Sequence, residues 1–431
     1  MDTIFALASG STRAGVAVIR VSGVLALDTL KKLSGKRNFT PRMAHVVTLT
    51  DGDKKIDKGL AVYFQSPASF TGEDVVEYQV HGGKSVIDGV ISALSKIVGC
   101  RMAQPGEFTR RAFENGKMDL TEAEAVADLI DAETEAQRLQ ALDQLEGGLS
   151  KLYQSWAESL KKLLAHQEAE IEFPDEDLPA GLSSSLEKPL QILLSEIKAH
   201  LDDDRRGERL RDGILVAILG APNAGKSSLL NALVRRDVAI VSDEAGTTRD
   251  IIEAHLDLGG YPVILADTAG LRLDAGKVEA EGIRRAKNLS READLKIALF
   301  DGTQNKDTET LNEIDERTII VYSKSDIVKN KTDDFYISST TGEGLDLLLK
   351  TLTQKVAALF GQKTGPTLSR QRYREALTET TIMLERSLVA SLPELAAEDL
   401  RMALRSLGKI TGRVHIEDLL DVIFRDFCIG K

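Results

Sequence analysis

Gly220-Ala-Pro-Asn-Ala-Gly-Lys-Ser-Ser228 follows the apolar run Ile214–Leu219 and opens a helical pattern at Lys226–Leu233. In such a strand–loop–helix, successive backbone N–H groups line a concavity and the helix N-terminus adds partial positive charge. Lys226 adds a full charge, and the Ser227 hydroxyl suits a magnesium ion that bridges the outer phosphates. The pattern predicts a nucleotide site on an α/β sheet. A plain glycine turn between a core strand and a helix is the alternative, and the motifs downstream argue against it.

A second motif, Asp267-Thr268-Ala269-Gly270, follows the apolar strand Val263–Ala266. A carboxylate at the end of a strand beside the phosphate loop can hold magnesium through water, and the glycine N–H can then contact the γ-phosphate. Between the two motifs lies the polar stretch Gly246-Thr247-Thr248-Arg249-Asp250, where a threonine can cap the metal only while the γ-phosphate is present. Gly259-Gly260 predicts a hairpin turn, hence one antiparallel strand on an otherwise parallel sheet.

The base is specified by Ser323-Lys324-Ser325-Asp326, which follows the strand pattern Thr318–Tyr322. A carboxylate here can accept two hydrogen bonds from the guanine edge. Adenine offers no such pair of donors, so Asp326 would select GTP over ATP. A helix N-cap is the alternative role for Asp326. A last short strand is expected at Tyr336–Ser338, after which Ser338-Ser339-Thr340 would contact the base through backbone.

These motifs resemble those of the translation-factor-related GTPases, with one departure. That group has Asn-Lys-x-Asp, whereas this chain has Ser323 in the asparagine position. We expect weaker GTP affinity and an unchanged base preference, because the shorter side chain loses a contact to the base.

The water-activating residue of Ras-like enzymes is a glutamine after the Asp-x-x-Gly motif, and this chain has Leu271 there. Glu279 or Glu281 could orient the attacking water through a second water, although both also fit a solvated helix face. No arginine finger is identifiable, and a monovalent cation could replace it. Asn223 could offer that cation an oxygen, or could simply form the turn.

Composition limits the class of protein. A chain of 431 residues holds about two to three domains. Its formal charge of −12 argues against indiscriminate nucleic-acid binding, although an acidic protein can act on RNA that a partner holds. Cys100 and Cys428 are too few for a disulfide framework. We see no signal peptide and no apolar run near the ~20 residues of a membrane span, so we expect a cytoplasmic protein without a membrane partner.

The texture of the chain predicts three domains. Residues 1–117 alternate strand and helix patterns, such as the strands Val16–Val21 and Val75–Val80, and form an α+β domain. Helical patterns fill residues 118–211 and 361–431, with a capping box expected at Thr121-x-x-Glu124. Residues 212–360 form the nucleotide domain. We therefore expect an α/β module inserted into a discontinuous helical domain.

The ends of the chain carry a more specific resemblance. It closes on Cys428-Ile429-Gly430-Lys431, and its first 117 residues contain a run of further motifs. Those motifs are Arg20-Val21-Ser22-Gly23, Ser69-Phe-Thr-Gly-Glu-Asp74, His81-Gly82-Gly83, Pro105-Gly-Glu-Phe-Thr-Arg-Arg-Ala-Phe113 and Asn115-Gly116-Lys117. Together with the nucleotide motifs, they make the whole chain resemble the bacterial tRNA-modification GTPases of the MnmE (TrmE) family. Gly10-Ser-Thr-Arg-Ala-Gly15 departs from a more Pro/Gly-rich family loop.

The resemblance implies a multidomain fold: an N-terminal tetrahydrofolate-binding-like α+β domain that forms a homodimer, an all-α helical domain, and an inserted Ras-like P-loop GTPase domain. It also implies a potassium-stimulated GTPase that needs magnesium. Such a protein binds GTP/GDP and acts with MnmG, an FAD-dependent partner, in a hetero-oligomer. The pair would add a carboxymethylaminomethyl or aminomethyl group at carbon 5 of the wobble uridine of certain tRNAs. A tetrahydrofolate derivative, 5-formyl or 5,10-methylene, would donate the one-carbon unit.

Site residues follow from the resemblance by position. The potassium ligands would be Asn223, Ser242, Glu244 and Thr247. The magnesium ligands would be Ser227 and Thr248. The residues that contact folate would be Arg20, Glu77, Lys117 and Lys431. The catalytic residues would be Glu279, Lys226 and Thr248, with Glu279 orienting water. The full GTP-binding set would be Asn223, Ala224, Gly225, Lys226, Ser227, Ser228, Ser242, Asp243, Glu244, Ala245, Gly246, Thr247, Thr248, Asp267, Thr268, Ala269, Gly270, Ser323, Lys324, Asp326, Ser338 and Ser339.

Some of these residues also fit plainer roles. Without the resemblance, Arg20 and Lys117 would be ordinary surface charges. Cys428 matches a family cysteine and is a possible reactive thiol, but buried structural thiols are the commoner case.

Two rival functions remain at this point. One is an RNA-binding ribosome-assembly GTPase switch, which needs a basic module after the GTPase domain. Residues 361–431 carry 11 Lys and Arg against 10 Asp and Glu, so the sequence weakens that alternative. The other is a folate-responsive binding protein whose GTPase motifs are idle.

Overall fold

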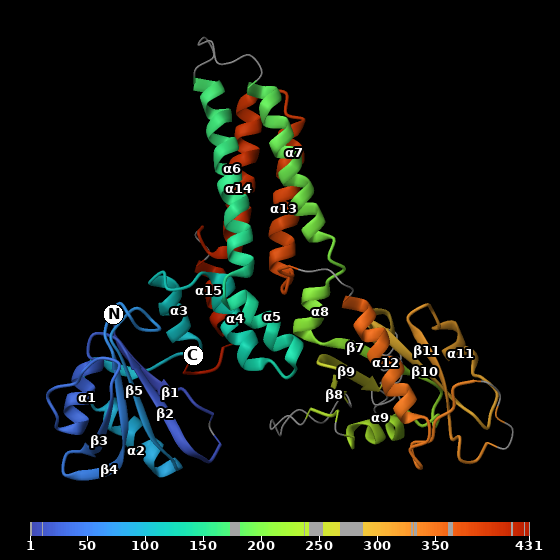
Figure 1. Cartoon of the computed structure of the whole chain (residues 1–431), viewed down its shortest axis with the longest axis horizontal. Helices are drawn as coiled ribbons and strands as arrows, with labels where there is room; N and C mark the ends of the chain where they lie inside the picture. The colour runs from blue at the N-terminus through green and yellow to red at the C-terminus, as the bar shows by residue number, and fades with distance from the viewer. Residues whose placement is uncertain are drawn as a thin grey trace, which may run out of the picture. The chain divides into compact units, whose positions relative to one another are not determined.

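The computed structural model describes residues 2–10, 12–172, 182–236, 238–240, 253–267, 288–328, 331, 334–360, 365–414, 417–425 and 427–430. They form two compact units, each built from separate stretches of chain. Unit 1 comprises Met1–Ala127, Ser150–Glu158 and Leu404–Lys431, and unit 2 comprises Asp128–Leu149 and Ser159–Ala403. The elements are labelled in Figure 1. The three-domain boundaries drawn from the sequence stay a prediction.

Unit 1 contains a six-stranded sheet in the order β3-β4-β5-β2-β1-β6. Among the described strand pairs of this sheet, β1–β6 is parallel and the others are antiparallel. Alternating side chains such as Ile19, Val21, Tyr63 and Tyr78 form the core with α1 and α2. The strands are β1 (Thr3–Leu7), β2 (Ala14–Ser22), β3 (Ala44–Asp51), β4 (Lys54–Phe64), β5 (Val75–Gly82) and β6 (Cys100–Met102), and the helices are α1 (Ala26–Ser34) and α2 (Lys84–Ser95).

A second part of unit 1 joins helices from both ends of the chain. They are α3 (Glu107–Glu114), α4 (Leu120–Asp131) up to Ala127, α6 (Gly148–Glu172) from Ser150 to Glu158, α14 (Pro393–Thr411) from Leu404, and α15 (Glu417–Arg425). Leu120 of α4 packs with Phe424 and Phe427 in one apolar cluster. Just beyond, Ile429 forms a bridge with Pro105. A Cβ on Gly430 would lie 2.1 Å from the Leu7 carbonyl oxygen, so only glycine fits this close approach.

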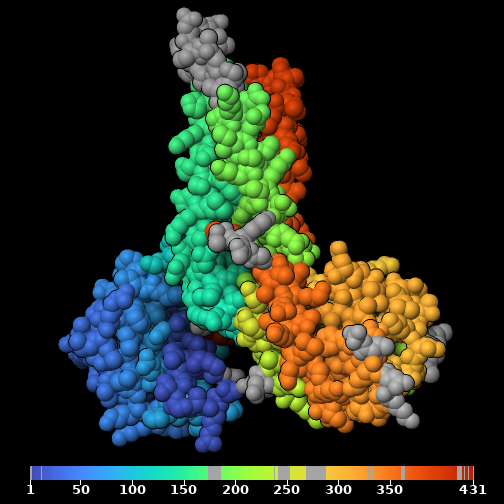
Figure 2. Space-filling model, turned by 45° about the vertical axis from the view of Figure 1, so that its right-hand side comes forward, coloured from blue at the N-terminus to red at the C-terminus, as the bar shows by residue number. Residues whose placement is uncertain are grey.

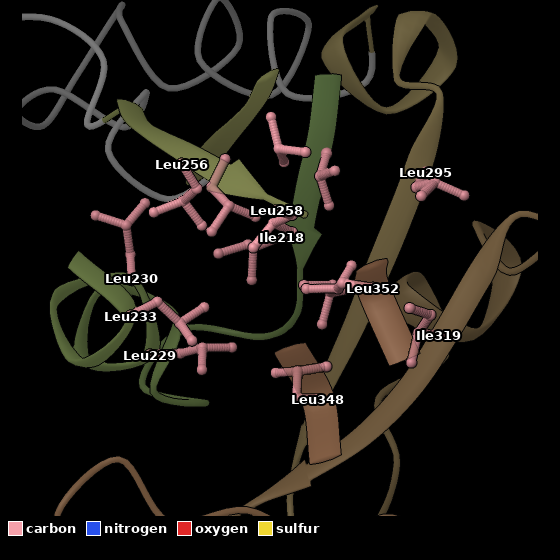
Figure 3. Packing of buried hydrophobic residues seen from close by; sticks show 14 of the residues in the cluster. Ile218, Leu229, Leu230, Leu233, Leu256, Leu258, Leu295, Ile319, Leu348 and Leu352 are labelled. Atoms are coloured by element: carbon pink, nitrogen blue, oxygen red, sulfur yellow. The ribbon is translucent and has the colours of Figure 1, made fainter. Parts of the chain in front are cut away.

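Unit 2 contains a five-stranded sheet in the order β11-β10-β7-β9-β8. β8 is antiparallel to β9 and the other pairs are parallel, as the sequence predicted. Gly259 and Gly260 form the turn with φ of +67° and +89°. Leucines of α9 and α12 pack against this sheet (Figure 3). The bounds are β7 (Ile214–Leu219), α9 (Lys226–Val234), β8 (Glu253–Leu258), β9 (Tyr261–Asp267), β10 (Leu295–Asp301), α11 (Thr308–Asn312), β11 (Thr318–Ser323) and α12 (Leu345–Phe360).

Helices make up the rest of unit 2. They are α5 (Glu135–Leu145), α6 beyond Glu158, α7 (Leu182–Leu201), α8 (Arg206–Asp212), α13 (Gln371–Leu388) and α14 up to Ala403. The longer ones, α6, α7, α13 and α14, run side by side (Figures 1 and 2). Ion pairs link them: Arg401 on α14 pairs with Glu168 on α6, and Lys198 on α7 with Glu385 on α13.

Two local predictions from the sequence differ from the structure: the start of one helix and one short strand. The capping box predicted at Thr121 and Glu124 is wrong, since α4 begins at Leu120 and both residues lie inside it. The Asp119 carboxylate instead accepts the N–H of Thr121 and Glu122, and the Glu122 carboxylate accepts the Asp119 N–H. An acceptor two residues earlier thus satisfies the free donors. Tyr336–Ser338 is not a strand and contributes only a bridge between Tyr336 and Tyr322.

Candidate functional site

The phosphate loop connects β7 to α9 and needs its glycines. A Cβ on Gly220 would lie 2.4 Å from the Leu299 carbonyl oxygen of the neighbouring strand β10. Gly225, which caps α9, has φ of +97°, in the left-handed region. Asn223 has φ of +64°, a conformation that asparagine tolerates better than most residues. The backbone therefore takes the course of a phosphate loop.

Lys226, at the first position of α9, is 5% exposed. Its Nζ donates to the carbonyl oxygens of Gly220 at 2.6 Å and Ala221 at 2.8 Å. The loop thus curls over the ammonium group that it is predicted to present to a phosphate chain. The two carbonyl oxygens therefore hold the Lys226 ammonium group at the phosphate loop through hydrogen bonds.

The predicted metal-binding motifs meet in space. Asp267 ends β9, is fully buried, and pairs in register with Ile218 of β7. Because both strands end at the same edge of the sheet, the Ser227 Oγ reaches the Asp267 Oδ2 at 2.7 Å. A hydroxyl and a carboxylate are the oxygen ligands that magnesium prefers, so this pair fits that ion.

Ser323, at the end of β11, is 4% exposed and faces the phosphate loop. Its Oγ lies 2.6 Å from the Ala224 carbonyl oxygen and 3.2 Å from the Phe300 carbonyl oxygen. The hydroxyl therefore links the base motif to the phosphate loop. The expected effect of this serine on GTP affinity stays a prediction.

Neighbouring residues fix the rest of the base motif. The Lys324 Nζ donates to Asp301 at 2.6 Å. Burial raises the pKa of Asp301, but hydrogen bonds from Lys324 and Thr303 outweigh it and leave that pKa below its usual value. A hydrogen bond from Ser338 similarly lowers the pKa of Asp326. Asp326 is thus held ionised, the state that accepts hydrogen bonds from a guanine edge.

The remaining predicted nucleotide residues divide in two. Ala224 is buried, Asn223 and Ser228 are exposed on the loop, and Ser339 follows the fully buried Ser338. The others, among them the catalytic candidates Thr248 and Glu279, lie outside the described residues. These are Ser242, Asp243, Glu244, Ala245, Gly246, Thr247, Thr248, Thr268, Ala269, Gly270 and Glu279.

Unit 1 brings the predicted folate residues around one loop. Arg20 on β2 and Glu77 on β5 are cross-strand neighbours and form an ion pair at 2.9 Å. The Arg20 guanidinium lies 5.2 Å from the centroid of the Phe70 ring. The Lys117 Nζ donates to the Pro67 carbonyl oxygen at 3.0 Å. Both cations therefore touch the Pro67–Phe70 segment, and Lys431 lies outside the described residues.

Beside this group lies a buried polar network that sequence reasoning did not single out. Arg111, 5% exposed, pairs with Glu73 at 3.1 Å and with Glu107 at 3.0 Å. The Ser22 hydroxyl also donates to Glu73 at 2.7 Å. Each of these residues belongs to a motif quoted above, so the signal was present, but the sequence did not show their mutual contact. The network stiffens the loop that the predicted folate residues share.

Cys428 is exposed, so the buried-thiol alternative is wrong. Within the described ranges, no group of three or more His, Cys, Asp or Glu side chains could hold a metal ion. None of the described helices has the length and apolar character that crossing a membrane requires.

Comparisons with known proteins agree with this site. A family described as MnmE helical domain matches residues 120–428, and one described as GTP-binding protein TrmE N-terminus matches residues 3–117. The tRNA modification GTPase MnmE of Parvibaculum lavamentivorans is 52% identical, covering 100% of both chains. That of Paramagnetospirillum magneticum is 51% identical, again over 100% of both. A crystal structure of Aquifex aeolicus Era is 25% identical, is matched over 42% of this chain and 69% of its own, and has a TM-score of 0.27.

The phosphate loop, the Ser227–Asp267 pair and the motif predicted to select guanine are those of a P-loop GTPase. Its sheet has the strand order and single antiparallel strand described above. The chain belongs to the MnmE family of tRNA modification GTPases, and is accordingly a GTP-hydrolysing enzyme.

Proposed function

We propose that this protein is a potassium-stimulated GTPase that modifies carbon 5 of the wobble uridine of certain tRNAs. It acts as a homodimer with an MnmG-type FAD protein, and the added group is carboxymethylaminomethyl or aminomethyl. The observation that carries the proposal is full-length identity of 52% to a tRNA modification GTPase, in a chain with an assembled phosphate loop. The proposed compartment is the cytoplasm.

Nucleotide binding exchanges contacts that the loop now makes with itself. The Lys226 ammonium leaves the carbonyls of Gly220 and Ala221 for phosphate oxygens, which carry more negative charge. The Ser227 hydroxyl, which now contacts Asp267, and Thr248 would hold magnesium, which would supply positive charge to the outer phosphates. Asp326 accepts hydrogen bonds from guanine. In this proposal, Glu279 orients the attacking water.

Potassium would bind at Asn223, Ser242, Glu244 and Thr247. The support in this chain is the exposed Asn223 in its left-handed conformation. A cation between the phosphates supplies the positive charge that an arginine finger supplies elsewhere, worth about 10³–10⁵ in rate. Equal hydrolysis rates in potassium and sodium, at one ionic strength, would count against this assignment. Full hydrolytic activity of a Glu279→Ala variant would count against the water-orienting role of Glu279.

The proposed folate site uses Arg20, Lys117 and Lys431 as cations for the glutamate tail of 5-formyl- or 5,10-methylene-tetrahydrofolate. Glu77, the ion-pair partner of Arg20, would be the fourth folate contact. Support comes from the position of Arg20, Glu77 and Lys117 beside the Pro67–Phe70 segment. Their present partners are a carboxylate and a carbonyl, which a ligand of matching charge can replace.

The decisive experiment is mass spectrometry of tRNA nucleosides from a strain that lacks the gene. We expect unmodified wobble uridine, restored by the parent gene and left unrestored by Lys226→Ala. A Lys350→Ala gene, altered at an exposed lysine on α12, serves as the matched control. Full modification in the deletion strain, with no other enzyme covering, would contradict the proposal. No feature of residues 365–414 favours the rival ribosome-assembly switch; tight, salt-sensitive binding to rRNA in a gel shift would revive it.

A further inference from the structure

Positive charge is unevenly distributed along this acidic chain. Residues 1–117 carry 16 Lys and Arg against 11 Asp and Glu, a formal charge of +5, whereas the whole chain carries −12. The excess comes entirely from residues 31–58, which hold eight Lys and Arg against three Asp. The rest of the chain, residues 118–431, therefore carries −17. Net charge alone hides this local concentration.

The structure gathers this segment along one border of the unit 1 sheet. β3 is an edge strand, and α1 ends beside it, where the Thr50 hydroxyl donates to the Leu33 carbonyl oxygen. The Lys36 Nζ, just beyond α1, donates to the Val46 carbonyl oxygen of β3 at 2.6 Å. The turn from β3 to β4 follows Asp51, which pairs with Lys96 at the end of α2. This part of the chain is drawn in blue in Figures 1 and 2.

Four exposed cations lie along this border, and we call them the basic edge. They are Lys36, Arg37, Lys54 and Lys55. Two acidic residues belong to the same turn. Asp51 forms an ion pair with Lys96, and Asp53 is exposed. Across the ranges that the structure describes, no cation of the basic edge forms an ion pair. Arg20, Arg101 and Arg111 of the same unit, in contrast, each pair with a glutamate.

We propose that the basic edge binds the phosphate backbone of the tRNA. This inference rests on the proposed function, from which it takes the identity of the RNA. The run from Val46 to Asp51 along β3 spans about 16 Å at roughly 3.3 Å per residue. That length faces roughly four or five phosphates of one strand. The loop Gly35-Lys36-Arg37-Asn38-Phe39-Thr40 adds amide and hydroxyl donors beside the cations.

A plainer explanation exists for lysines beside an edge strand, because they prevent edge-to-edge association of sheets. That role needs charge of either sign and predicts no affinity for RNA. Phosphate binding needs positive charge, and each contact releases counterions, so it makes affinity fall with salt. Charge reversal with salt titration therefore separates the two explanations.

The test uses the full-length protein and fluorescently labelled tRNA in anisotropy titrations over a range of salt. One variant combines Arg37→Glu with Lys54→Glu, and a second combines Lys36→Glu with Lys55→Glu. The matched control combines Lys84→Glu with Lys188→Glu, two exposed lysines on α2 and α7. Its change in net charge is identical. Tetrahydrofolate binding and tRNA-free GTP hydrolysis report whether each variant is folded, since no edge residue belongs to either site.

We expect each edge variant to weaken tRNA binding at least tenfold at about 0.1 M salt. The slope of log affinity against log salt should flatten by about 2, while the control stays within twofold of the parent. Edge variants that bind tRNA like the control would overturn the proposal. So would a parent that does not bind tRNA, or one that binds vesicles of anionic lipid but not tRNA. Because binding is measured directly, a loss confined to edge variants supports the edge even if wobble-uridine modification fails.

Discussion

The two predicted ligand sites are built in opposite ways. The nucleotide site takes its core from consecutive residues, Gly220–Ser228, and adds Asp267 at the end of β9 and Asp326 three residues beyond β11. The folate site takes Arg20, Glu77 and Lys117 from two strands and a segment beyond α3. In the first, cation and hydroxyl contact their own loop or the adjacent strand. In the second, a cross-strand ion pair holds the ligand-binding groups.

The difference shows what each ligand must replace. A triphosphate displaces neutral carbonyls from Lys226, and a stronger acceptor takes their place. At the predicted folate site, a folate would have to compete with Glu77 for Arg20; the side chains of this ion pair are 14% and 21% exposed. Mutation should therefore affect the nucleotide site more strongly than the folate site.

The largest effect is expected for Lys226→Ala. Loss of a preorganised charge at the phosphates should lower kcat/KM for GTP about 10³-fold, roughly 4 kcal/mol of barrier. Steady-state hydrolysis measures it, with Lys350→Ala as the control. Binding of 5-formyl-tetrahydrofolate should stay unchanged. A kcat/KM within tenfold of that of the parent would contradict the role of Lys226 at the nucleotide site.

The next effect is expected for Arg20→Ala. Loss of charge-assisted hydrogen bonds to a carboxylate should weaken 5-formyl-tetrahydrofolate binding about tenfold to a hundredfold, with GTP hydrolysis unchanged. Calorimetry measures it. Arg101→Ala is the matched control, since Arg101 forms its ion pair with Glu107 in the same unit. Unaltered folate affinity would remove Arg20 from the site, and equal losses in both variants would indicate a structural role.

A smaller effect is expected at Ser323. Ser323→Ala removes the donor to the Ala224 carbonyl, costing about 1 kcal/mol and weakening GTP binding roughly fivefold. Ser323→Asn installs the residue common in related GTPases and should tighten binding. Guanine-over-adenine selectivity should persist in both. Competition binding with GTP and ATP measures both quantities; a weaker Ser323→Asn would mean that the serine suits this loop better.

The smallest effect concerns acid stability of unit 2. Burial lowers the pKa of His200 to about 4, with Asp203 opposing the shift and Arg374 adding to it. The unfolded chain, with a histidine pKa of about 6.5, therefore binds more protons between these values, and stability falls as pH drops through that window. His200→Gln should lose less thermal stability than the parent between pH 7 and 5, by a few degrees in Tm. Identical pH profiles would exclude His200 as a cause.

Local chemistry made some features predictable from sequence, and chain register hid others. The phosphate loop and the Gly259-Gly260 turn depend on consecutive residues, so their patterns sufficed. The pairing of β1 (Thr3–Leu7) with β2 and β6 joins separate segments of the chain, so no local pattern predicts it. The Arg20–Glu77 pair arises from the register of β2 against β5, which no local pattern specifies. Nor could periodicity place the Ser323 hydroxyl on the Ala224 carbonyl.

The close approach of Gly430 to Leu7 joins a segment that is translated late to one that is translated early. Translation delivers the first 127 residues early, yet Leu120 lacks Phe424 and Phe427 until these two residues have been synthesised about 300 residues later. Until then, the interior of unit 1 is incomplete. A stop codon introduced just before Phe424 would therefore damage the region that is synthesised first.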